Sequence, residues 1–255
     1  MLLGAQTFTI RAYTQNERDF REAMRRVAAI GYKSVQLSAI GPLDPHLLRE
    51  ICDENGLQIV LTHTNPERML TDPDAVIRDH DILGCKYIGV GAMNERYRNP
   101  AWVERFAKDF EVPAKKMRDA GKLLMYHNHN FEWERLPDGR RIIDVLLETM
   151  PAELMGFTLD TYWVQAAGAD IIDWLEILQD RIPCVHLKDM MVKGFEPRIA
   201  AVGDGNINFA KVLAKLAELG KTEHILVEQD NCWGESPFDC LERSYNHITK
   251  LGYGL

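Results

Sequence analysis

The chain has 255 residues, of which 46% are apolar and 27% are charged, and its formal net charge is −8 at pH 7. So large an apolar share can build a substantial core, which excludes a disordered or fibrous protein. The acidic balance disfavours broad binding to a nucleic-acid backbone, because that affinity depends on clustered lysines and arginines.

Two kinds of segment alternate along the whole sequence. Short apolar or β-branched runs predict strands, and they occupy residues 2–10, 32–40, 57–64, 85–93, 122–129, 155–162, 183–190 and 224–231. Amphipathic stretches with apolar residues at helical spacing lie between them, and the clearest cover 16–31, 44–56, 102–121, 208–220 and 237–252. Each of these stretches ends at a glycine, which relieves the left-handed turn that follows a helix.

This alternation predicts the fold class. Eight strand-and-helix units of roughly 30 residues each match a single-domain (β/α)₈ TIM barrel that spans residues 1–255. An open, doubly wound sheet is the alternative, and it would need a glycine-rich phosphate-binding turn after the first strand. No such turn follows the first run, and no Ser/Gly/Pro-rich linker divides the chain. We therefore expect one barrel domain.

The active site of a (β/α)₈ barrel forms at the carboxyl ends of the strands. Position within the repeat, rather than residue type alone, therefore selects the polar residues that matter. This criterion retains Gln6, Gln36, His63, the segment 127–132, Asp160, His186, Lys188, Asp189, Glu228 and Asp230.

Four of these residues predict a metal site: Glu132, Asp160, His186 and Glu228. Three carboxylates that converge in a barrel mouth would repel one another and resist desolvation unless a cation compensated them. Three oxygens and one nitrogen suit Mn²⁺, Mg²⁺ or Co²⁺, and Zn²⁺ is also compatible; we expect Mn²⁺. Taken singly, Asp160 could instead cap a turn, and His186 could be a core histidine.

Five segments resemble, in this order, a known family: HNHNFEW, LDTYWVQAAG, VHLKDM, VGDGNINF and ILVEQDN. They are similar to the sugar phosphate isomerase/epimerase family of xylose-isomerase-like TIM barrels, along nearly the whole chain. The resemblance implies a metal set of Glu, Asp, His and Glu, which by motif position falls on Glu132, Asp160, His186 and Glu228. One departure is Tyr126, which stands near the place where the ketose epimerases of this family have their first ligand glutamate.

The resemblance also implies a reaction: proton abstraction next to the carbonyl of a ketose, a sugar phosphate or a related polyol ketone, through a metal-stabilised enediolate. Glu132 and Glu228 would carry the proton, with two bases giving epimerisation and one base giving isomerisation. An inosose-type dehydratase or lyase shares the first step and would use His127 or His129 as its acid. Strand alternation places both histidines on one face, and either could contact the substrate.

Further residues are expected to bind a small sugar or polyol. His63 would orient a hydroxyl, and Arg198 would hold a distal hydroxyl or a phosphate. Lys188 is another candidate, although pairing with Asp189 is an equal alternative. Trp163 lies close to a proposed ligand, and its indole face suits the C–H face of a sugar.

Two other function classes stay open. Endonucleases that cleave at abasic sites share this fold, but they use a larger, histidine-rich metal cluster and a basic face, whereas this chain is acidic. A barrel that binds sugar without catalysis is the other alternative, and it would show binding without proton exchange.

The remaining expectations concern environment and assembly. No stretch reaches the roughly 18 apolar residues that span a bilayer, and no secretion signal opens the sequence, so we expect a cytoplasmic protein without a membrane partner. The five cysteines form no CxxC pair and are expected to be free thiols. A homo-oligomer is possible on general grounds.

Overall fold

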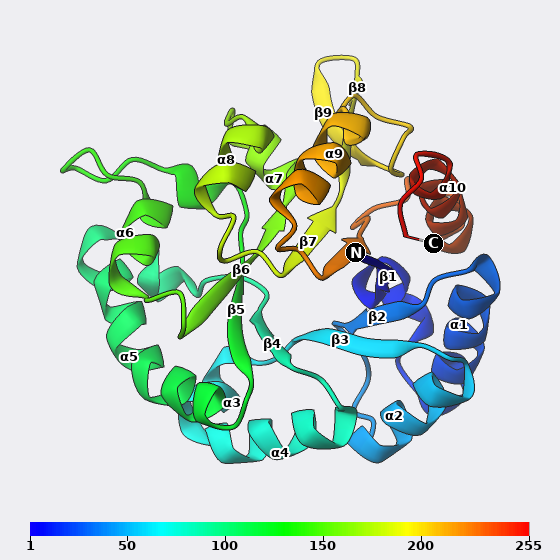
Figure 1. Cartoon of the computed structure of the whole chain (residues 1–255), viewed down its shortest axis with the longest axis horizontal. Helices are drawn as coiled ribbons and strands as arrows, with labels where there is room; N and C mark the ends of the chain where they lie inside the picture. Colours follow the sequence, from blue (N-terminus) through cyan, green and yellow to red (C-terminus); the bar gives the residue numbers. More distant parts are fainter. Residues whose placement is uncertain (255) are drawn as a thin grey trace.

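The computed structural model describes residues 1–254. Within that range, eight parallel strands close into a barrel in the spatial order β1-β10-β7-β6-β5-β4-β3-β2 (Figure 1). Their bounds are β1 Leu2–Gln6, β2 Ser34–Leu37, β3 Gln58–His63, β4 Tyr87–Val90, β5 Leu123–His127, β6 Met155–Asp160, β7 Cys184–Leu187 and β10 His224–Val227. The predicted (β/α)₈ barrel is confirmed; the predicted domain bounds 1–255 include one residue, Leu255, outside the described range.

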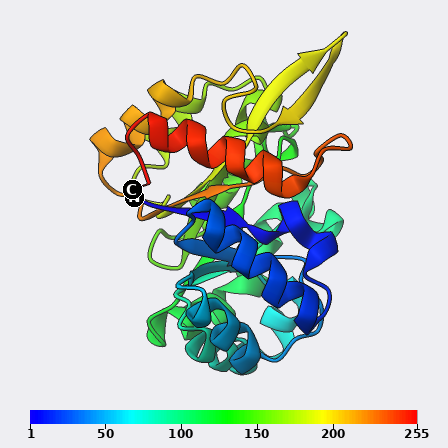
Figure 2. The ribbon, with the colours of Figure 1, turned by 90° about the vertical axis from the view of Figure 1, so that its right-hand side faces the viewer.

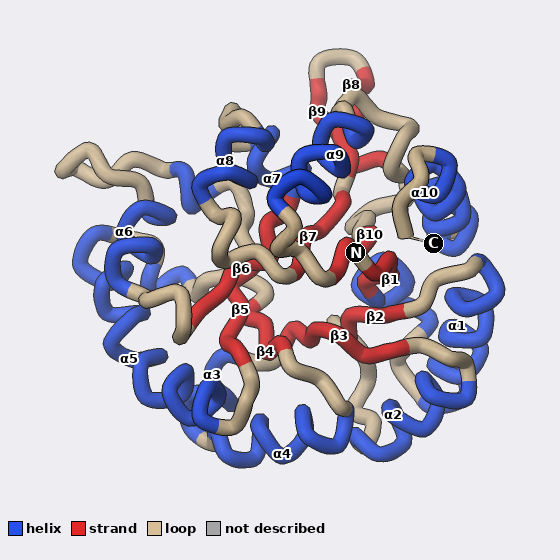
Figure 3. The backbone as a smooth tube through the Cα atoms, in the orientation of Figure 1, coloured by secondary structure: helices blue, strands red, loops and turns tan. Residues whose placement is uncertain are grey.

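Helices surround the ring of strands (Figure 3). The α-helices are α1 Glu17–Ile30, α2 Pro45–Glu54, α3 Pro66–Thr71, α4 Pro73–Leu83, α5 Pro100–Asp119, α6 Ile142–Thr149, α7 Thr161–Ala166, α8 Ile171–Ile177, α9 Phe209–Leu219 and α10 Pro237–Lys250. The 3₁₀ helices are η1 Thr7–Tyr13, η2 Glu95–Tyr97 and η3 Phe131–Trp133. Several α-helices have a capping side chain at their amino end. Asn16 caps α1 and Ser236 caps α10, and each accepts a hydrogen bond from an otherwise unpaired N–H group of the first turn.

The first strand closes the barrel because it pairs on both sides. Ala5 of β1 lies in parallel register with Val227 of β10 and with Val35 of β2. The strands from the two ends of the sequence therefore lie side by side, and the ring has no unpaired edge.

The barrel interior has an apolar layer and a polar layer. Alternate residues of a strand point to the same face, so each strand contributes to both layers. The buried apolar layer includes Leu61, Met125, Cys184 and Leu226. The polar layer follows two residues later on the same strands and includes His63, His127, His186 and Glu228. The strand order thus gathers these polar side chains at the carboxyl end of the barrel.

A two-stranded antiparallel hairpin interrupts the seventh unit. It consists of β8 Asp189–Lys193 and β9 Glu196–Ala200, and it stands away from the barrel (Figure 2). The turn between its strands contains Gly194 at a φ of 65°, a conformation that glycine adopts without strain. The sequence patterns predict a strand at 183–190 but not this hairpin, because residues 192–197 at its tip are exposed and its apolar alternation is weak.

The structure contains the five cysteines as free thiols, as the sequence predicts: Cys52, Cys85, Cys184, Cys232 and Cys240. Burial raises the pKa of the Cys85 thiol to about 12, so this group is unreactive near neutral pH. Among the described helices, none combines the length and apolar character needed to cross a bilayer.

Candidate active site

Four buried side chains meet at the carboxyl end of the barrel. One nitrogen or oxygen atom from each of His127, Asp160, His186 and Glu228 lies within 4.8 Å of the others. The shortest of these separations joins Glu228 Oε2 to His186 Nδ1, at 2.9 Å. Asp160 Oδ2 lies 3.3 Å from His127 Nε2 and 3.6 Å from His186 Nδ1. Four adjacent strands, β5, β6, β7 and β10, position the group.

The hydrogen bonds of the two histidines determine which of their nitrogens face the group. His127 Nδ1 lies 2.9 Å from the Gly91 carbonyl oxygen, and His186 Nε2 lies 2.6 Å from Gln36 Oε1. Carbonyl oxygens only accept, so these nitrogens carry protons. The opposite nitrogens, His127 Nε2 and His186 Nδ1, face the two carboxylates and would offer lone pairs to a cation bound between them. Such a donor set fits a divalent cation.

Lys188 provides part of the positive charge that the carboxylates need. Its ammonium nitrogen is buried, 2.8 Å from Glu228 Oε2, 3.1 Å from Asp160 Oδ2 and 2.9 Å from Asp230 Oδ1. The Asp160 and Glu228 carboxylates carry more negative charge than one ammonium offsets, and a buried excess charge is costly. A divalent cation would balance it.

Burial and charge act in opposite directions on these groups. Burial alone would raise the pKa of Glu228, but the Lys188 ammonium and the His186 imidazole hold that pKa well below its ordinary range. Burial alone would lower the pKa of Lys188, but Asp160 and then Glu228 raise it above its ordinary range. The site therefore contains ionised carboxylates and a charged lysine at neutral pH.

Glu132 lies outside this group, contrary to the ligand set expected from the sequence. Its carboxylate is buried and accepts hydrogen bonds from the Tyr126 hydroxyl (2.7 Å) and the His129 backbone N–H (2.8 Å). Tyr126 precedes His127 on β5 and so points to the opposite face, toward Phe106 of α5. The turn of η3 carries Glu132 to that outer side, and His127 supplies the fourth atom of the group instead.

A cavity of about 260 Å³ opens on the group. Its walls include His63, His127, His129, Lys188 and Glu228. Burial lowers the pKa of His129 to about 3 and that of His63 well below its ordinary value, so both imidazoles are neutral. The structure thus brings three of the predicted substrate-binding histidines, and Lys188, to one cavity.

A family model for the xylose isomerase-like TIM barrel matches residues 24–244 of the chain. The chain belongs to the xylose isomerase-like TIM barrel family. The family predicted from the five sequence segments is therefore confirmed.

The proteins that this xylose isomerase-like barrel resembles include an inosose dehydratase, a sugar phosphate isomerase/epimerase and a ribulose epimerase. An inosose dehydratase from Geobacillus kaustophilus (strain HTA426) is 25% identical over 258 residues, covering 86% of this chain and 80% of that protein. A sugar phosphate isomerase/epimerase from Parabacteroides distasonis ATCC 8503 has a TM-score of 0.82 at 22% identity, covering 96% and 92% of the two chains. An L-ribulose 3-epimerase has a TM-score of 0.76 at 14% identity, covering 98% and 94%. The structural likenesses show the shared fold.

Two predicted substrate contacts of this family member, Trp163 and Arg198, are not among the residues that line the cavity. Trp163 of α7 packs with its ring centroid 5.0 Å from that of His129 and 5.5 Å from the Lys188 ammonium. Arg198 lies on the hairpin strand β9, where its guanidinium stacks on Trp233 at 4.3 Å. The hairpin, which the sequence patterns do not predict, therefore holds Arg198 at the rim of the barrel.

Three polar residues support the group, and the strand-end criterion retained all three without assigning them a role. Gln6 Nε2 donates to Glu228 Oε1 at 2.9 Å, and Gln36 orients His186. Asp230 pairs with Lys188 and lines the cavity. All three stand at strand ends, and Asp230 follows Glu228 by two residues, which is the signal that places them in the barrel mouth.

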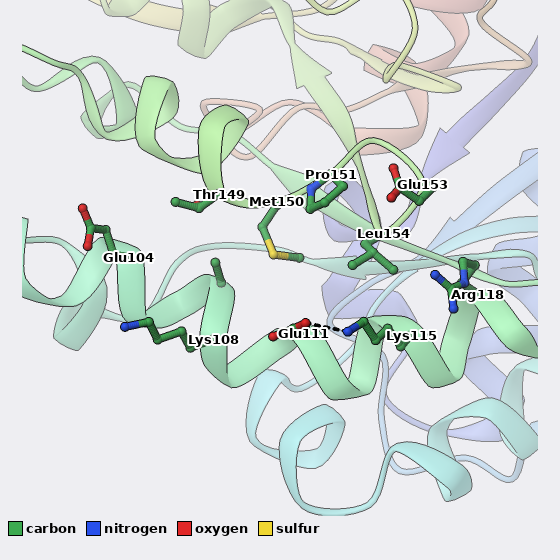
Figure 4. A pocket seen from close by; sticks show the side chains of 11 residues that line it. Glu104, Lys108, Glu111, Lys115, Arg118, Thr149, Met150, Pro151, Glu153 and Leu154 are labelled. Atoms are coloured by element: carbon green, nitrogen blue, oxygen red, sulfur yellow. Dashed lines mark hydrogen bonds and ion pairs between the residues drawn. The ribbon is translucent and has the colours of Figure 1, made fainter.

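A larger cavity of this barrel, about 470 Å³, lies elsewhere (Figure 4). It is bounded by α5 and by the segment that leads into β6, with Leu154 directly before the first residue of that strand. Charged surface side chains such as Lys108 and Glu111 line it. It is therefore near the amino end of β6, remote from the end where barrels of this type carry their active sites.

Proposed function

We propose that the chain is a metal-dependent sugar isomerase or epimerase that moves a proton next to the carbonyl of a polyhydroxy ketone. The observation that carries this proposal is the buried group of His127, Asp160, His186 and Glu228, in which two lone-pair nitrogens and two carboxylate oxygens face one another beside a cavity. Bound by these four residues, a divalent cation, which we expect to be Mn²⁺, would polarise the substrate carbonyl and acidify the neighbouring C–H bond.

Glu228 is the carboxylate placed to accept the proton. Gln6 holds its Oε1 atom at 2.9 Å, which leaves Oε2 toward the cavity. The Lys188 ammonium, 2.8 Å from Oε2, keeps the carboxylate ionised and lies where it would stabilise negative charge on the substrate oxygen. A proton returned by Glu228 to the neighbouring carbon gives isomerisation.

Asp230 is the second carboxyl group at the cavity and takes the role that the sequence suggested for Glu132. Burial and the nearby Glu228 carboxylate raise the pKa of Asp230, so this group holds a proton more readily than Glu228 does. Delivery of a proton from Asp230 to the opposite face of the substrate carbon gives epimerisation. Glu132, anchored to Tyr126, supports the end of β5.

Dehydration of an inosose-type substrate is the second candidate, favoured by the relatives named inosose dehydratases. It shares the proton abstraction by Glu228 and then expels a β-hydroxyl as water. The sequence suggested His127 or His129 as the donor of a proton to that hydroxyl, but burial lowers the pKa of His129 to about 3 and the Gly91 carbonyl engages His127 Nδ1, so Asp230, whose pKa is raised, is the acid placed at the cavity.

The protein is expected to exchange substrate hydrogen for deuterium. The purified, Mn²⁺-loaded protein would be incubated in D₂O with ketoses, their phosphates and inososes, and followed by NMR and mass spectrometry. Deuterium next to the carbonyl, lost after treatment with a chelator and restored by Mn²⁺, supports the proposal; product that has also lost water supports the dehydratase. Metal-dependent cleavage of abasic DNA, or sugar binding without exchange over the whole panel, would contradict it.

A further inference from the structure

A second cleft lies at the rim of the barrel mouth, between η1 and the segment that joins β10 to α10. Its volume is about 360 Å³, and Tyr13 and Trp233 are among its lining residues. Both aromatic side chains are exposed, Tyr13 to 44% and Trp233 to 47%. Asp230 lines this cleft and also the cavity at the buried group, so the two spaces share a wall.

Trp233 is held in a fixed position although nearly half of its surface is exposed. Its backbone has a φ of 53°, which is uncommon for a residue with a side chain. Its N–H group donates to Asn231 Oδ1 at 2.8 Å, and its indole Nε1 donates to the Ile199 carbonyl of β9 at 2.9 Å. The Arg198 guanidinium stacks on the ring at 4.3 Å. The loop, the hairpin and a cation–π contact thus orient an indole at the cleft.

Tyr13 and Arg11 define the other side of the cleft. Tyr13 packs edge-on against Phe238 of α10, with the ring centroids 5.3 Å apart. The Arg11 guanidinium lies over Phe8 and donates to the carbonyl oxygens of Phe8 (2.7 Å) and Asp230 (3.0 Å). Phe8 itself lines the deeper cavity, so this stacked pair forms the boundary between the two spaces.

The charged residues of the cleft are already engaged. Arg11 is bound to backbone carbonyls, Asp230 is paired with Lys188, and Glu235 Oε2 lies 2.9 Å from the Arg243 guanidinium. Among the described residues of the lining, Arg11 is the one cation, and it is turned toward two backbone carbonyls and the Phe8 ring, so the lining favours an uncharged ligand over a phosphate. Exposed aromatic faces with a few polar groups suit an uncharged ligand that has an apolar face and a hydroxylated edge. A pyranose ring has both.

We infer that this cleft binds a second sugar ring, so that the substrate of the proposed reaction is an uncharged glycoside whose ketone-bearing ring enters the deeper cavity. The inference rests on the proposed function for that deeper cavity. The second ring contacts Trp233 and Tyr13, and its hydroxyl groups face Asn231 and Glu235. A single-ring sugar leaves the cleft unused.

Saturation-transfer NMR with maltose, cellobiose, lactose and sucrose, and with glucose and fructose for comparison, tests the cleft directly. We expect at least one disaccharide to receive saturation in both rings and to bind roughly tenfold more tightly than either monosaccharide. Trp233→Ala is expected to remove that advantage, and so is Tyr13→Ala, which leaves the strained loop intact. Trp102→Ala, at a tryptophan on α5 that is 38% exposed and outside the cleft, is the matched control.

Disaccharides that bind no better than glucose and fructose, or an advantage that survives both variants, would overturn the inference. Deuterium exchange with fructose and with glucosyl-fructoses separates this failure from a failure of the proposed function. If deuterium exchange occurs but disaccharides bind no better than monosaccharides, the inference about the cleft is wrong and the proposed function stands. If disaccharide binding depends on Trp233 and Tyr13 but no ketone exchanges deuterium, the inference about the cleft stands and the proposed function is wrong.

Discussion

Replacement of Glu228 by glutamine is expected to abolish divalent-metal binding and to lower the rate of deuterium exchange by roughly 10²- to 10⁴-fold. The glutamine keeps the size of the side chain and can still accept a hydrogen bond from Gln6. It removes the anionic oxygen that lies 2.8 Å from the Lys188 ammonium and 2.9 Å from His186 Nδ1. Metal content by mass spectrometry and the exchange rate by NMR measure the two effects.

The matched control for this variant is Glu218→Gln. Glu218 lies on α9 with 67% of its side chain exposed, and it pairs only with Lys215. The Glu218→Gln protein should retain both the bound metal and the rate of deuterium exchange. A Glu228→Gln protein that still bound metal and exchanged deuterium at the rate of the unchanged protein would contradict the role assigned to Glu228.

The stability of the protein is expected to fall as pH rises through about 7 because of Glu132. Burial raises the pKa of this carboxyl from 4.5 to about 7, despite the hydrogen bonds from Tyr126 and His129. The folded protein therefore binds the Glu132 proton more tightly than the unfolded chain does, and this contribution to stability is complete below pH 4.5 and lost above pH 7. The loss is about 3 kcal/mol.

Glu132→Gln isolates this effect. The amide oxygen can accept from the His129 N–H and the amide nitrogen can donate to the Tyr126 hydroxyl, so both hydrogen bonds have replacements without an ionisable group. We expect the free energy of unfolding of the variant, relative to the unchanged protein, to rise by about 3 kcal/mol between roughly pH 4 and pH 8. Urea unfolding of chelator-treated protein at both pH values measures this difference, because other groups titrate equally in the two proteins.

Glu132→Ala serves as the contrasting variant. It leaves the Tyr126 hydroxyl and the His129 N–H buried without partners, which costs about 2–4 kcal/mol at low pH. Equal pH dependence in Glu132→Gln and the unchanged protein would show that Glu132 does not carry this effect. If the Glu132→Gln protein is as stable as the unchanged protein but no longer binds metal, Glu132 is a metal ligand, as expected from the sequence.

Local patterns were sufficient to predict the fold. Eight apolar runs recur along the chain, and five of them are followed by a helical stretch that ends at a glycine, as at Gly31 and Gly220. This repetition makes a closed parallel barrel the consistent solution. The β8–β9 hairpin carries no such signal, because the side chains toward its tip are exposed and only its base is buried.

The candidate site was predictable where a regular strand sets the direction of a side chain. Asp160, His186 and Glu228 stand at positions in β6, β7 and just after β10 that the strand alternation turns inward. Glu132 lies beyond the end of β5, in η3, where alternation no longer applies. Its carboxylate is instead placed by two hydrogen bonds whose partners, Tyr126 and the His129 N–H, cannot be read from spacing.

The balance of charge could not be derived from the sequence either. Strand position brings Lys188 to the barrel mouth, but its contact with three carboxylates depends on how β6, β7 and β10 meet in space. Sequence reasoning assigned the whole compensation to a metal. The structure places the Lys188 ammonium among the carboxylates, so a cation at the four-residue group would supply only the remaining charge.

The most direct test of this account is a crystal of the protein soaked in Mn²⁺ and measured for anomalous scattering. We predict one strong anomalous peak bound by His127 Nε2, Asp160 Oδ2, His186 Nδ1 and Glu228 Oε2, with Glu132 still bound to Tyr126. A barrel mouth without a peak at saturating Mn²⁺, or a peak that has Glu132 among its ligands in place of His127, would contradict it.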